Sequence, residues 1–232
     1  MGCGCVNLTR DKYTIENILV DKVKEPKDII SNLPINEYIK KVFYLINKVR
    51  MNPSEFIGDI ENGEKFIKEL NGRKIFDDNK IKVSLNEGKI MFQDCANYLK
   101  TLQPMEELIF CDDIVLECPK DEQNIKGINF FKQKLLEKKE NFGIESYFKD
   151  SIRFPEISVL LMLVDDSSKN PRKKREALLN PKYKYIGIST SDIDENKKNN
   201  NLNNMNDGLN NINQIIKNDI NYKPFCAYFT LK

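Results

Sequence analysis

The sequence predicts an α+β fold, because helical and strand patterns occupy different parts of the chain. In the first half, apolar residues recur at intervals of three and four, the spacing of one face of a helix. Two stretches near the carboxyl end, residues 183–188 and 225–231, are rich in the aromatic and β-branched residues that favour strands. Helices and strands that are segregated along a chain are typical of α+β proteins.

The first helix is predicted to run from Ile35 to about Arg50. Its apolar stripe consists of Ile35, Ile39, Val42, Phe43, Ile46 and Val49. The pair Asn52-Pro53 ends this helix, and a proline suits the first turn of the next one. We expect the second helix to carry the apolar residues of 56–70 and to end at Asn71-Gly72, because glycine commonly closes a helix.

Three more helices are predicted in the middle of the chain. Ser84 to Glu87 has the pattern of a capping box, in which serine and glutamate each bond the other's backbone, so a helix is expected from there to about Leu102. A lysine-rich helix is expected over residues 122–139. The stretch Ile157 to Val164, opened by Pro155, is apolar nearly all round, which predicts a buried helix.

The two carboxyl-terminal strands are predicted to form a β-hairpin. Between them, residues 194–217 are dominated by asparagine and are too polar to pack into a core. We expect a disordered insert at the hairpin tip, where extra loop length costs little. The chain therefore divides into an N-terminal tail and spacer, residues 1–33, and a folded domain, residues 34–232.

Histidine is absent from all 232 residues, and this absence excludes several kinds of site. A Ser-His-Asp triad, a Cys-His pair and a histidine zinc site all need an imidazole. The formal net charge of +2 gives no electrostatic case for nucleic-acid binding. We therefore expect no catalytic residues, no metal, no other cofactor and no nucleic-acid partner.

The apolar segments and the cysteines indicate a cytosolic protein. The longest apolar stretch is far shorter than the roughly 20 residues that cross a bilayer, and the N-terminus lacks the apolar core of a signal peptide. Four cysteines, Cys95, Cys111, Cys118 and Cys226, are scattered without a C-x-x-C pair. Reduced thiols are thus expected, in a protein that is not secreted.

The N-terminal sequence Met1-Gly2-Cys3-Gly4-Cys5-Val6 predicts acylation. Gly2 is the acceptor position for myristate, and Cys3 and Cys5 beside it are sites for palmitate. One myristoyl chain binds membranes with a constant of only about 10⁴ M⁻¹, so a second signal is needed. The charges of residues 7–30 cancel, which leaves the two cysteines to supply it. Val6 stands where the pattern has Ser or Thr; the alternatives are an unmodified terminus or a small C-x-C metal or redox site.

The most basic run in the chain consists of Arg172, Lys173, Lys174 and Arg175. It is either a solvated loop at a helix start or a contact patch for anionic lipid head groups or an acidic partner. Each basic residue near an anionic leaflet contributes about 1 kcal/mol to binding. The preceding Asp165 and Asp166 would point apart on a helix, so we expect them to cap a helix or to pair with the basic run.

Three further polar residues are expected to be structural. Asn47 and Arg50 lie on one side of the first helix, and we expect Arg50 to bond the backbone carbonyls of the following loop. Cys95 lies on the apolar stripe of its helix. It is therefore predicted to be a small core residue rather than a nucleophile, since no histidine can activate it.

Three blocks of sequence, in order, carry a resemblance to a known family. They are Ile46 to Pro53 with its Asn-x-x-Arg, the helix from Ser84 to Leu99, and Val164 to Ile188 with its Asp-Asp, basic run, Asn-Pro and tyrosine-rich strand. Together they resemble the CAP superfamily of cysteine-rich secretory, antigen 5 and pathogenesis-related proteins, whose domain is also called SCP, in its protist form. The resemblance implies an α-β-α sandwich, with an antiparallel sheet between helical layers.

The resemblance also implies where the family's site would lie. The CAP cavity is lined by two histidines and two acidic residues that can hold a divalent metal. Here Lys173 or Lys174 falls at one histidine position and Asn97 near the other, and Glu145 stands for one of the acids. A protonated ammonium cannot ligate a metal, so these four residues are expected to line a remnant cavity without a metal site.

From these observations we expect a non-catalytic, CAP-like binding or scaffold protein, tethered to the cytosolic face of a membrane. The resemblance suggests a lipid or sterol as ligand, and a protein partner is the other candidate. One alternative is a hydrolase that uses a carboxylate or a lysine of the remnant cavity, for example Glu145 with Lys174. That pair requires the two side chains to converge in a cleft. A second alternative is a soluble cytosolic interaction protein with an unmodified terminus.

Overall fold

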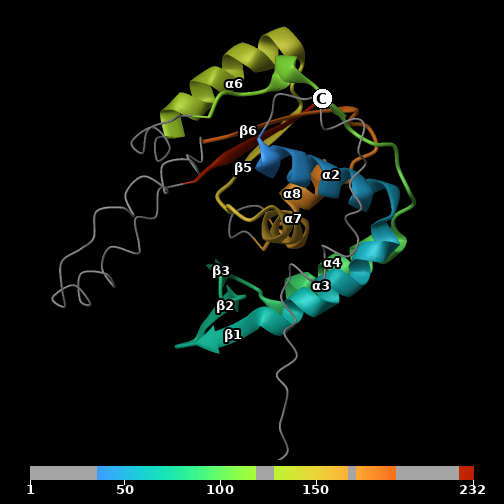
Figure 1. Ribbon diagram of the computed structural model, residues 1–232, viewed down its shortest axis with the longest axis vertical. Coiled ribbons are helices and arrows are strands. Elements are labelled where there is room, and N and C mark those ends of the chain that lie inside the picture. The colour runs from blue at the N-terminus through green and yellow to red at the C-terminus, as the bar shows by residue number, and fades with distance from the viewer. Residues whose placement is uncertain (1–35, 119–127, 167–170, 192–224) are drawn as a thin grey trace, which may run out of the picture.

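The computed structural model describes residues 36–118, 128–166, 171–191 and 225–232, which form six α-helices and two β-sheets (Figure 1). The helices are α2 (Glu37–Met51), α3 (Ile57–Gly63), α4 (Lys89–Thr101), α6 (Ile128–Phe142), α7 (Pro155–Val164) and α8 (Lys173–Leu178). Short 3₁₀ turns are η1 (Pro53–Phe56), η2 (Glu64–Phe66) and η3 (Asp112–Ile114). The strands are β1 (Ile67–Leu70), β2 (Arg73–Asp77), β3 (Lys82–Leu85), β4 (Ile109–Phe110), β5 (Ser146–Asp150), β6 (Tyr185–Thr190) and β7 (Ala227–Leu231). The predicted α+β class is confirmed.

Helices α2 and α7 form the centre of the core. α2 follows the predicted periodicity and begins at Asn36, whose side chain accepts the Ile39 N–H at 2.9 Å and so satisfies one of the unpaired donors of the first turn. α7 is the predicted apolar helix, and nearly all of its residues are buried. The two helices pack directly against each other. Burial of α7 all round explains why its sequence lacks a polar face.

The four-stranded sheet has the order β4-β6-β7-β5, with β7 paired antiparallel to both β6 and β5. The predicted hairpin of β6 and β7 is confirmed. The prediction of a fully antiparallel sheet is wrong, because β4 runs parallel to β6, with Ile109 opposite Tyr185. A parallel pair needs a long crossover, and the chain between β4 and β6 supplies one that includes α6, α7 and α8.

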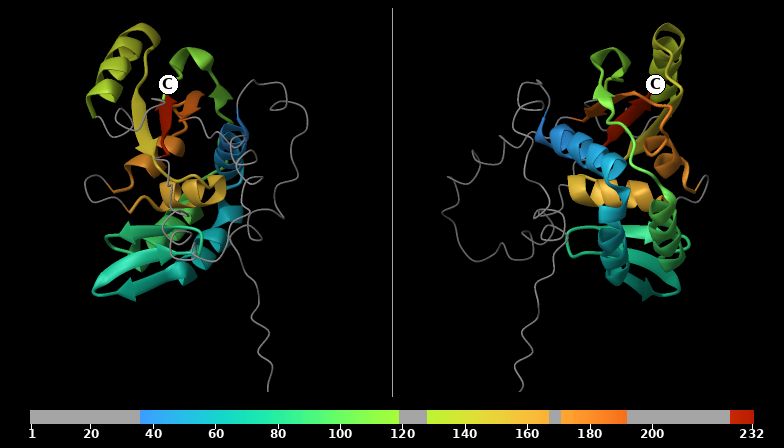
Figure 2. Two further views of the ribbon diagram at one scale, coloured as in Figure 1. Left: turned by 60° about the vertical axis from the view of Figure 1, so that its left-hand side comes forward. Right: turned by 90° about the vertical axis from the view of Figure 1, so that its right-hand side faces the viewer.

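Apolar side chains pack on both sides of the four-stranded sheet. α2 contacts β6, whereas α6 contacts η3, and α6 lies on the opposite side of the sheet from α2 in Figures 1 and 2. The larger core includes α2, α4 and α7. The smaller core contains the buried residues Ile114, Leu116, Leu135, Ile144, Cys226 and Tyr228.

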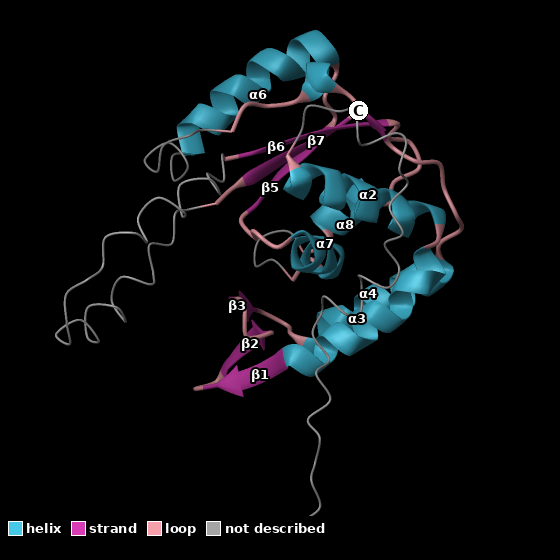
Figure 3. Cartoon of the chain, viewed as in Figure 1, coloured by secondary structure: helices cyan, strands magenta, loops and turns pink. Residues whose placement is uncertain are grey.

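The second predicted helix is wrong in its second half. The helical part ends at Gly63 and, after η2, the residues Ile67–Leu70 form strand β1 (Figure 3). Asn71 and Gly72 have φ values of 52° and 72°, so they form the two-residue turn of a hairpin between β1 and β2 rather than the end of a helix. Asn-Gly is the pair that such left-handed turns favour.

The predicted capping box is also wrong, because Ser84 belongs to strand β3. The loop before α4 is instead bound by Asp166, a residue far from it in the sequence. Its carboxylate accepts the backbone N–H groups of Asn86, Glu87 and Gly88 at 2.8–3.1 Å. A carboxylate at the start of a helix also interacts favourably with the helix dipole.

Asp165 forms a second link of this kind. It ends α7 in the left-handed conformation, with φ 47°, and its carboxylate accepts the Lys174 N–H at 2.7 Å in the first turn of α8. Asp165 and Asp166 therefore bind two different helix starts, as expected for adjacent residues that point apart. The prediction that this pair caps helices is confirmed.

Several predictions fall outside the described residues. The lysine-rich helix is confirmed as α6, but its predicted start at Glu122 cannot be compared with the structure. The acylation positions Gly2, Cys3 and Cys5 and the asparagine-rich insert at 194–217 also lie outside the described ranges. Within those ranges, no helix is both long and apolar enough to cross a membrane.

Arg50 is fully buried and bonds backbone carbonyls from distant parts of the chain. Its Nε donates to the Glu106 carbonyl at 2.9 Å, and its terminal nitrogens donate to three more carbonyls. These acceptors are Leu178 at 2.7 Å, Asn180 at 3.1 Å and Tyr183 at 3.2 Å. Burial lowers the pKa of Arg50 to about 10, so the guanidinium stays charged at neutral pH. The prediction that Arg50 is structural and bonds backbone carbonyls is confirmed, but none of these carbonyls belongs to the loop that directly follows α2.

Asn47, one turn before Arg50, fixes the same region. Its amide nitrogen donates to the Leu108 carbonyl at 3.0 Å and its amide oxygen accepts the Leu108 N–H at 2.8 Å. The Arg50 carbonyl in turn accepts the Met105 N–H at 2.9 Å. Together these bonds hold the segment between α4 and β4 against α2.

Replacing Arg50 with methionine is expected to lower the free energy of unfolding by at least about 3 kcal/mol, because the variant leaves buried carbonyls without a charged donor. Urea denaturation followed by circular dichroism measures this change. Arg73→Met is the matched control, since Arg73 is exposed, and it should leave the free energy of unfolding nearly unchanged. Equal losses in the two variants would contradict the central role of Arg50.

Candidate functional site

A pocket of about 190 Å³ lies where β3, the end of β5, α7 and α8 meet, and we call it the Lys174 pocket. Its walls are formed by Val83, Ser84, Leu85, Asp150, Ser151, Ile152, Leu161, Asp165, Asp166 and Lys174. Lys174 is the one member of the predicted remnant cavity that lines it. The pocket therefore combines apolar walls with three carboxylates and a single ammonium group.

The ammonium of Lys174 is paired inside this pocket with Asp150. The Nζ–Oδ1 distance is 3.3 Å, and the side chains of Lys174 and Asp150 are 25% and 6% exposed. The other oxygen of Asp150 accepts the Ser158 hydroxyl at 2.8 Å and the Ile152 N–H at 3.1 Å. A buried carboxylate with this many donors is held in a fixed position.

A buried tyrosine extends this network into the core. The Tyr38 hydroxyl donates to Ser158 Oγ at 2.9 Å, and Ser158 donates in turn to Asp150. Burial, together with the charge of Asp150, raises the pKa of Tyr38 far above its ordinary value of 10.0. Tyr38 is therefore a hydrogen-bond donor at any physiological pH and cannot serve as a base.

The other carboxylates of the pocket are also bonded by protein donors. Asp166 binds the loop before α4, and Asp165 binds the start of α8, as described above. Burial raises the pKa of Asp165, and the N–H and charge of Lys174 oppose that rise. The described side chains of the pocket can thus orient a small polar ligand, but their acids and their base are already engaged.

The structure does not bring the four predicted cavity residues together. Asn97 is exposed on the outer face of α4, in a groove of about 380 Å³ that shares no lining residue with the Lys174 pocket. Lys173 is exposed, with its ammonium 5.5 Å from the centre of the Tyr147 ring. Glu145 is exposed and pairs with Lys182 at 2.6 Å.

The predicted pairing of Glu145 with Lys174 is wrong. Glu145 directly precedes β5, whereas Lys174 bonds Asp150, the last residue of the same strand. Five residues of strand span roughly 16 Å, at about 3.3 Å per residue, so the two side chains lie near opposite ends of β5. The hydrolase alternative in that form has no site in this structure.

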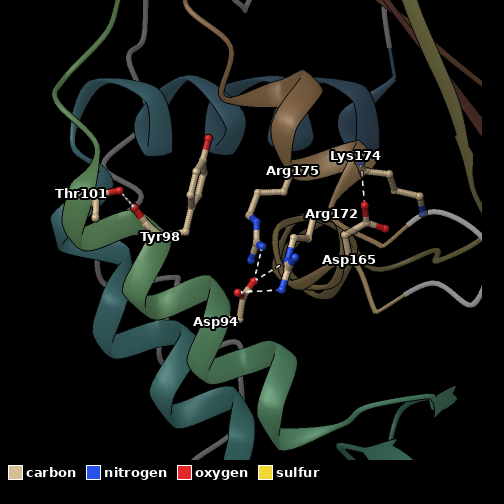
Figure 4. A network of polar contacts seen from close by, with 7 residues as sticks. All are labelled: Asp94, Tyr98, Thr101, Asp165, Arg172, Lys174 and Arg175. Atoms are coloured by element: carbon tan, nitrogen blue, oxygen red, sulfur yellow. Dashed lines mark hydrogen bonds and ion pairs between the residues drawn. The ribbon is translucent and has the colours of Figure 1, made fainter.

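Two arginines of the basic run converge on Asp94 of α4 (Figure 4). Arg172 binds both carboxylate oxygens, with Nε and a terminal nitrogen each at 3.0 Å. Arg175 binds Asp94 Oδ2, and its guanidinium lies 5.0 Å from the centre of the Tyr98 ring. This ion-pair cluster joins α4 to the start of α8, which are far apart in sequence.

The predicted basic contact patch is wrong for Arg175, whose side chain is only 2% exposed. It cannot touch a head group or a partner, because it is inserted between α8 and α4. Lys174 and Arg172 are also paired with acids, at Asp150 and Asp94. For the partly exposed residues Arg172, Lys173 and Lys174, the contact patch stays a prediction.

Cys95 lies fully buried on α4, as predicted for a core residue. Burial raises the pKa of its thiol to about 11, and the nearby charge of Arg175 opposes that rise only in part. The thiol is therefore protonated at neutral pH and is a weak nucleophile.

Sequence reasoning missed Asp94, Asp150 and Tyr38. Each acts across a long sequence separation, such as 120 residues between Tyr38 and Ser158 and 81 between Asp94 and Arg175. No local pattern marks such contacts. The one sequence signal for the acidic partners was the basic run itself. Cations on a short helix that packs against the core require acids nearby.

Comparison of the chain with models of known protein families, with curated proteins and with solved structures finds no significant match. Among the residues that the structure describes, no three histidine, cysteine, aspartate or glutamate side chains are grouped in a way that could hold a metal ion.

The Lys174–Asp150 pair should be strongly coupled in a double-mutant cycle. Lys174→Met and Asp150→Asn are each expected to lower the free energy of unfolding by about 1–3 kcal/mol, because each leaves a mostly buried partner unsatisfied. The double variant should lose less than the sum of the two, as measured by urea denaturation. Lys182→Met is the control, since its pair with Glu145 is exposed and screened by water. A loss for Lys174→Met no greater than that for Lys182→Met would refute the buried coupling.

Asp94 should contribute to stability in a pH-dependent way. Burial alone would raise the pKa of Asp94, but the hydrogen bonds and charges of Arg175 and Arg172 hold it below its ordinary value of 3.8. Such a group stabilises the folded state above its ordinary pKa, and this contribution is lost as the pH falls through the lowered value. The difference in unfolding free energy between wild type and Asp94→Asn should thus be large at neutral pH and shrink at a pH well below 3.8. The same difference at both pH values would contradict the ion-pair assignment.

Proposed function

We propose that this protein is a non-catalytic binding domain of the CAP type, held at the cytosolic face of a membrane by acyl chains on Gly2, Cys3 and Cys5. The observation that carries the proposal is the Lys174 pocket, in which the ammonium is paired with Asp150. A group already neutralised by a buried partner is poorly suited to act as a base or nucleophile. The absence of histidine from the whole sequence supports the same conclusion.

The proposed architecture is the α-β-α sandwich of that family, with a mixed rather than antiparallel sheet. Two observations support it: apolar clusters lie on both sides of the four-stranded sheet, and α6 lies on the side opposite to α2. The opening helix resembles the family's Asn-x-x-Arg, and its Asn47 and Arg50 hold the segment between α4 and β4.

The size of the pocket favours a protein partner over a sterol or lipid. Pockets that bury a small molecule usually measure about 300–1,000 Å³. At about 190 Å³ the Lys174 pocket is smaller, and it suits one side chain or a small polar group of a partner. The wider groove that includes Asn97 is lined by Glu61, Glu64 and Lys100, which makes it too polar for a sterol.

The membrane tether is tested by metabolic labelling with alkyne-tagged myristate and palmitate, followed by membrane fractionation. We expect wild type to carry both labels and to sediment with membranes. Gly2→Ala should lose myristate and move to the soluble fraction, because palmitate is added to proteins already at a membrane. The Cys3→Ser/Cys5→Ser variant should keep myristate but bind membranes only weakly, since one acyl chain gives marginal affinity.

The opposite outcome is equally informative. If wild type carries neither label and is soluble, the tether is wrong and the alternative of a soluble interaction protein is favoured. Lys22→Ala, a change in the spacer, serves as a control and should not alter either label or the fractionation.

A further inference from the structure

Cys118 and Cys226, 108 residues apart in the sequence, meet in the smaller core under α6. The Cys118 thiol donates to the Cys226 carbonyl oxygen, with an Sγ–O distance of 3.4 Å. Cys226 is fully buried, and Cys118 is half-buried at the edge of the same cluster. Their spacing in the sequence gave no sign of this contact.

The backbone that leads to Cys118 is fixed on the sheet. The Thr230 hydroxyl donates to the Ile114 carbonyl at 2.6 Å, and the Ser189 hydroxyl donates to the Leu116 carbonyl. These bonds tie the segment after η3 to both central strands, β6 and β7. The position of Cys118 is thus set by hydrogen bonds to the carbonyl groups of Leu116 and Ile114, which lie two and four residues before it.

A glycine makes this close approach of the segment to the sheet possible. A Cβ atom at Gly187 would lie 2.9 Å from the carbonyl carbon and oxygen of Ile114 and 2.7 Å from Thr230 Oγ1. Because backbone atoms cannot give way at that distance, only glycine fits there.

The backbone of Cys226 is also fixed by hydrogen bonds, in this case with Ser191. Its carbonyl accepts the Ser191 N–H at 2.9 Å, and its own N–H donates to Ser191 Oγ at 3.1 Å. Both cysteines are therefore presented by backbone that is fixed through hydrogen bonds. Two thiols fixed in this way lose little further freedom when they become linked.

The two thiols also differ in their electrostatic surroundings. The hydrogen bond from the Cys118 thiol lowers the pKa of Cys226, burial opposes this, and the charge of Lys149 supports it. The same interaction, together with burial, raises the pKa of Cys118. Cys226 can therefore take up the proton of Cys118, and Cys118, the less buried of the two, lies beside a cysteine that can resolve its sulfenic acid.

We propose that Cys118 and Cys226 form an oxidative modification site, in which hydrogen peroxide converts the two thiols into one disulfide. Cys118, which is the half-buried member of the pair, passes its proton to the Cys226 thiolate and attacks a peroxide oxygen; the O–O bond breaks, a sulfenic acid forms on Cys118, and the hydroxide that leaves takes up a proton as water. The Cys226 thiol then attacks the sulfenic sulfur; the S–S bond forms and a second water leaves. The protein loses two electrons and two protons, and the peroxide is reduced to two waters.

The disulfide would join the segment after η3 to the residue that precedes β7. It would cross-link a loop of more than a hundred residues, and such a link restricts the unfolded chain strongly. The oxidised protein should thus be more resistant to unfolding. This modification is independent of the proposed membrane tether and of the Lys174 pocket.

The test uses the reduced full-length protein, treated with hydrogen peroxide, alkylated and digested without reductant. We expect mass spectrometry to detect a peptide pair linked through Cys118 and Cys226, and the midpoint of thermal unfolding to rise by several degrees. Dithiothreitol should reverse both changes. Recovery of both residues as alkylated free thiols after the peroxide treatment would overturn the proposal.

Cysteine-to-serine variants test which cysteines form the link, and more than one variant is used because a single substitution could disturb folding. Cys111→Ser, in the same cluster, should keep the link and the rise in the midpoint. Cys118→Ser should lose both. Cys226→Ser should also lose both and accumulate a sulfenic acid on Cys118 that dimedone traps. A full rise in the midpoint in Cys118→Ser, or a dimedone adduct on Cys111 with none on Cys118 in Cys226→Ser, would show that the assigned pair is wrong.

Discussion

The guanidinium of Arg50 holds together segments that are far apart in the sequence, and the rest of the fold is arranged around it. A cation buried this deeply is tolerated only when its donors are satisfied. Here they bond carbonyls from the segment after α4, from the end of α8 and from the approach to β6. Because an arginine donates in a fixed planar geometry, these carbonyls must lie in one arrangement. Arg50 thus determines how the helical half of the domain meets the sheet.

Aspartates play the corresponding part around the Lys174 pocket. Asp94 joins α4 to α8, Asp150 joins β5 to α7 and α8, and Asp165 and Asp166 bind the starts of α8 and α4. Each side chain thereby gains partners that satisfy its charge in a partly buried position. The chemical consequence is a loss of reactivity. A pocket whose charged groups hold the walls together retains shape and polarity, which suit recognition, and has little spare acid or base for catalysis.

The elements that could be predicted from sequence are those defined by local periodicity. α2 has helical spacing over several turns, α7 is a continuous apolar run opened by a proline, and β6 and β7 are rich in strand-forming residues. The predictions were wrong where one local sequence pattern is compatible with two different structures. Asn71-Gly72 ends helices and also turns hairpins, and Ser84 begins a capping box by pattern but lies in a strand. The pocket was predictable only through Lys174, because its partner Asp150 is selected by tertiary packing, which no local pattern encodes.

The position of β7 in the sheet has a consequence for biosynthesis. β5 and β6 flank β7 but do not pair with each other, and both precede β7 in the chain. On the ribosome they emerge first, each with an open edge of unpaired backbone groups that can template wrong strand pairing. The sheet closes only when β7 is inserted between them. The nascent protein therefore passes through a stage in which every strand through β6 has been synthesised but β7 is still missing from between β5 and β6. During that stage its open strand edges favour aggregation.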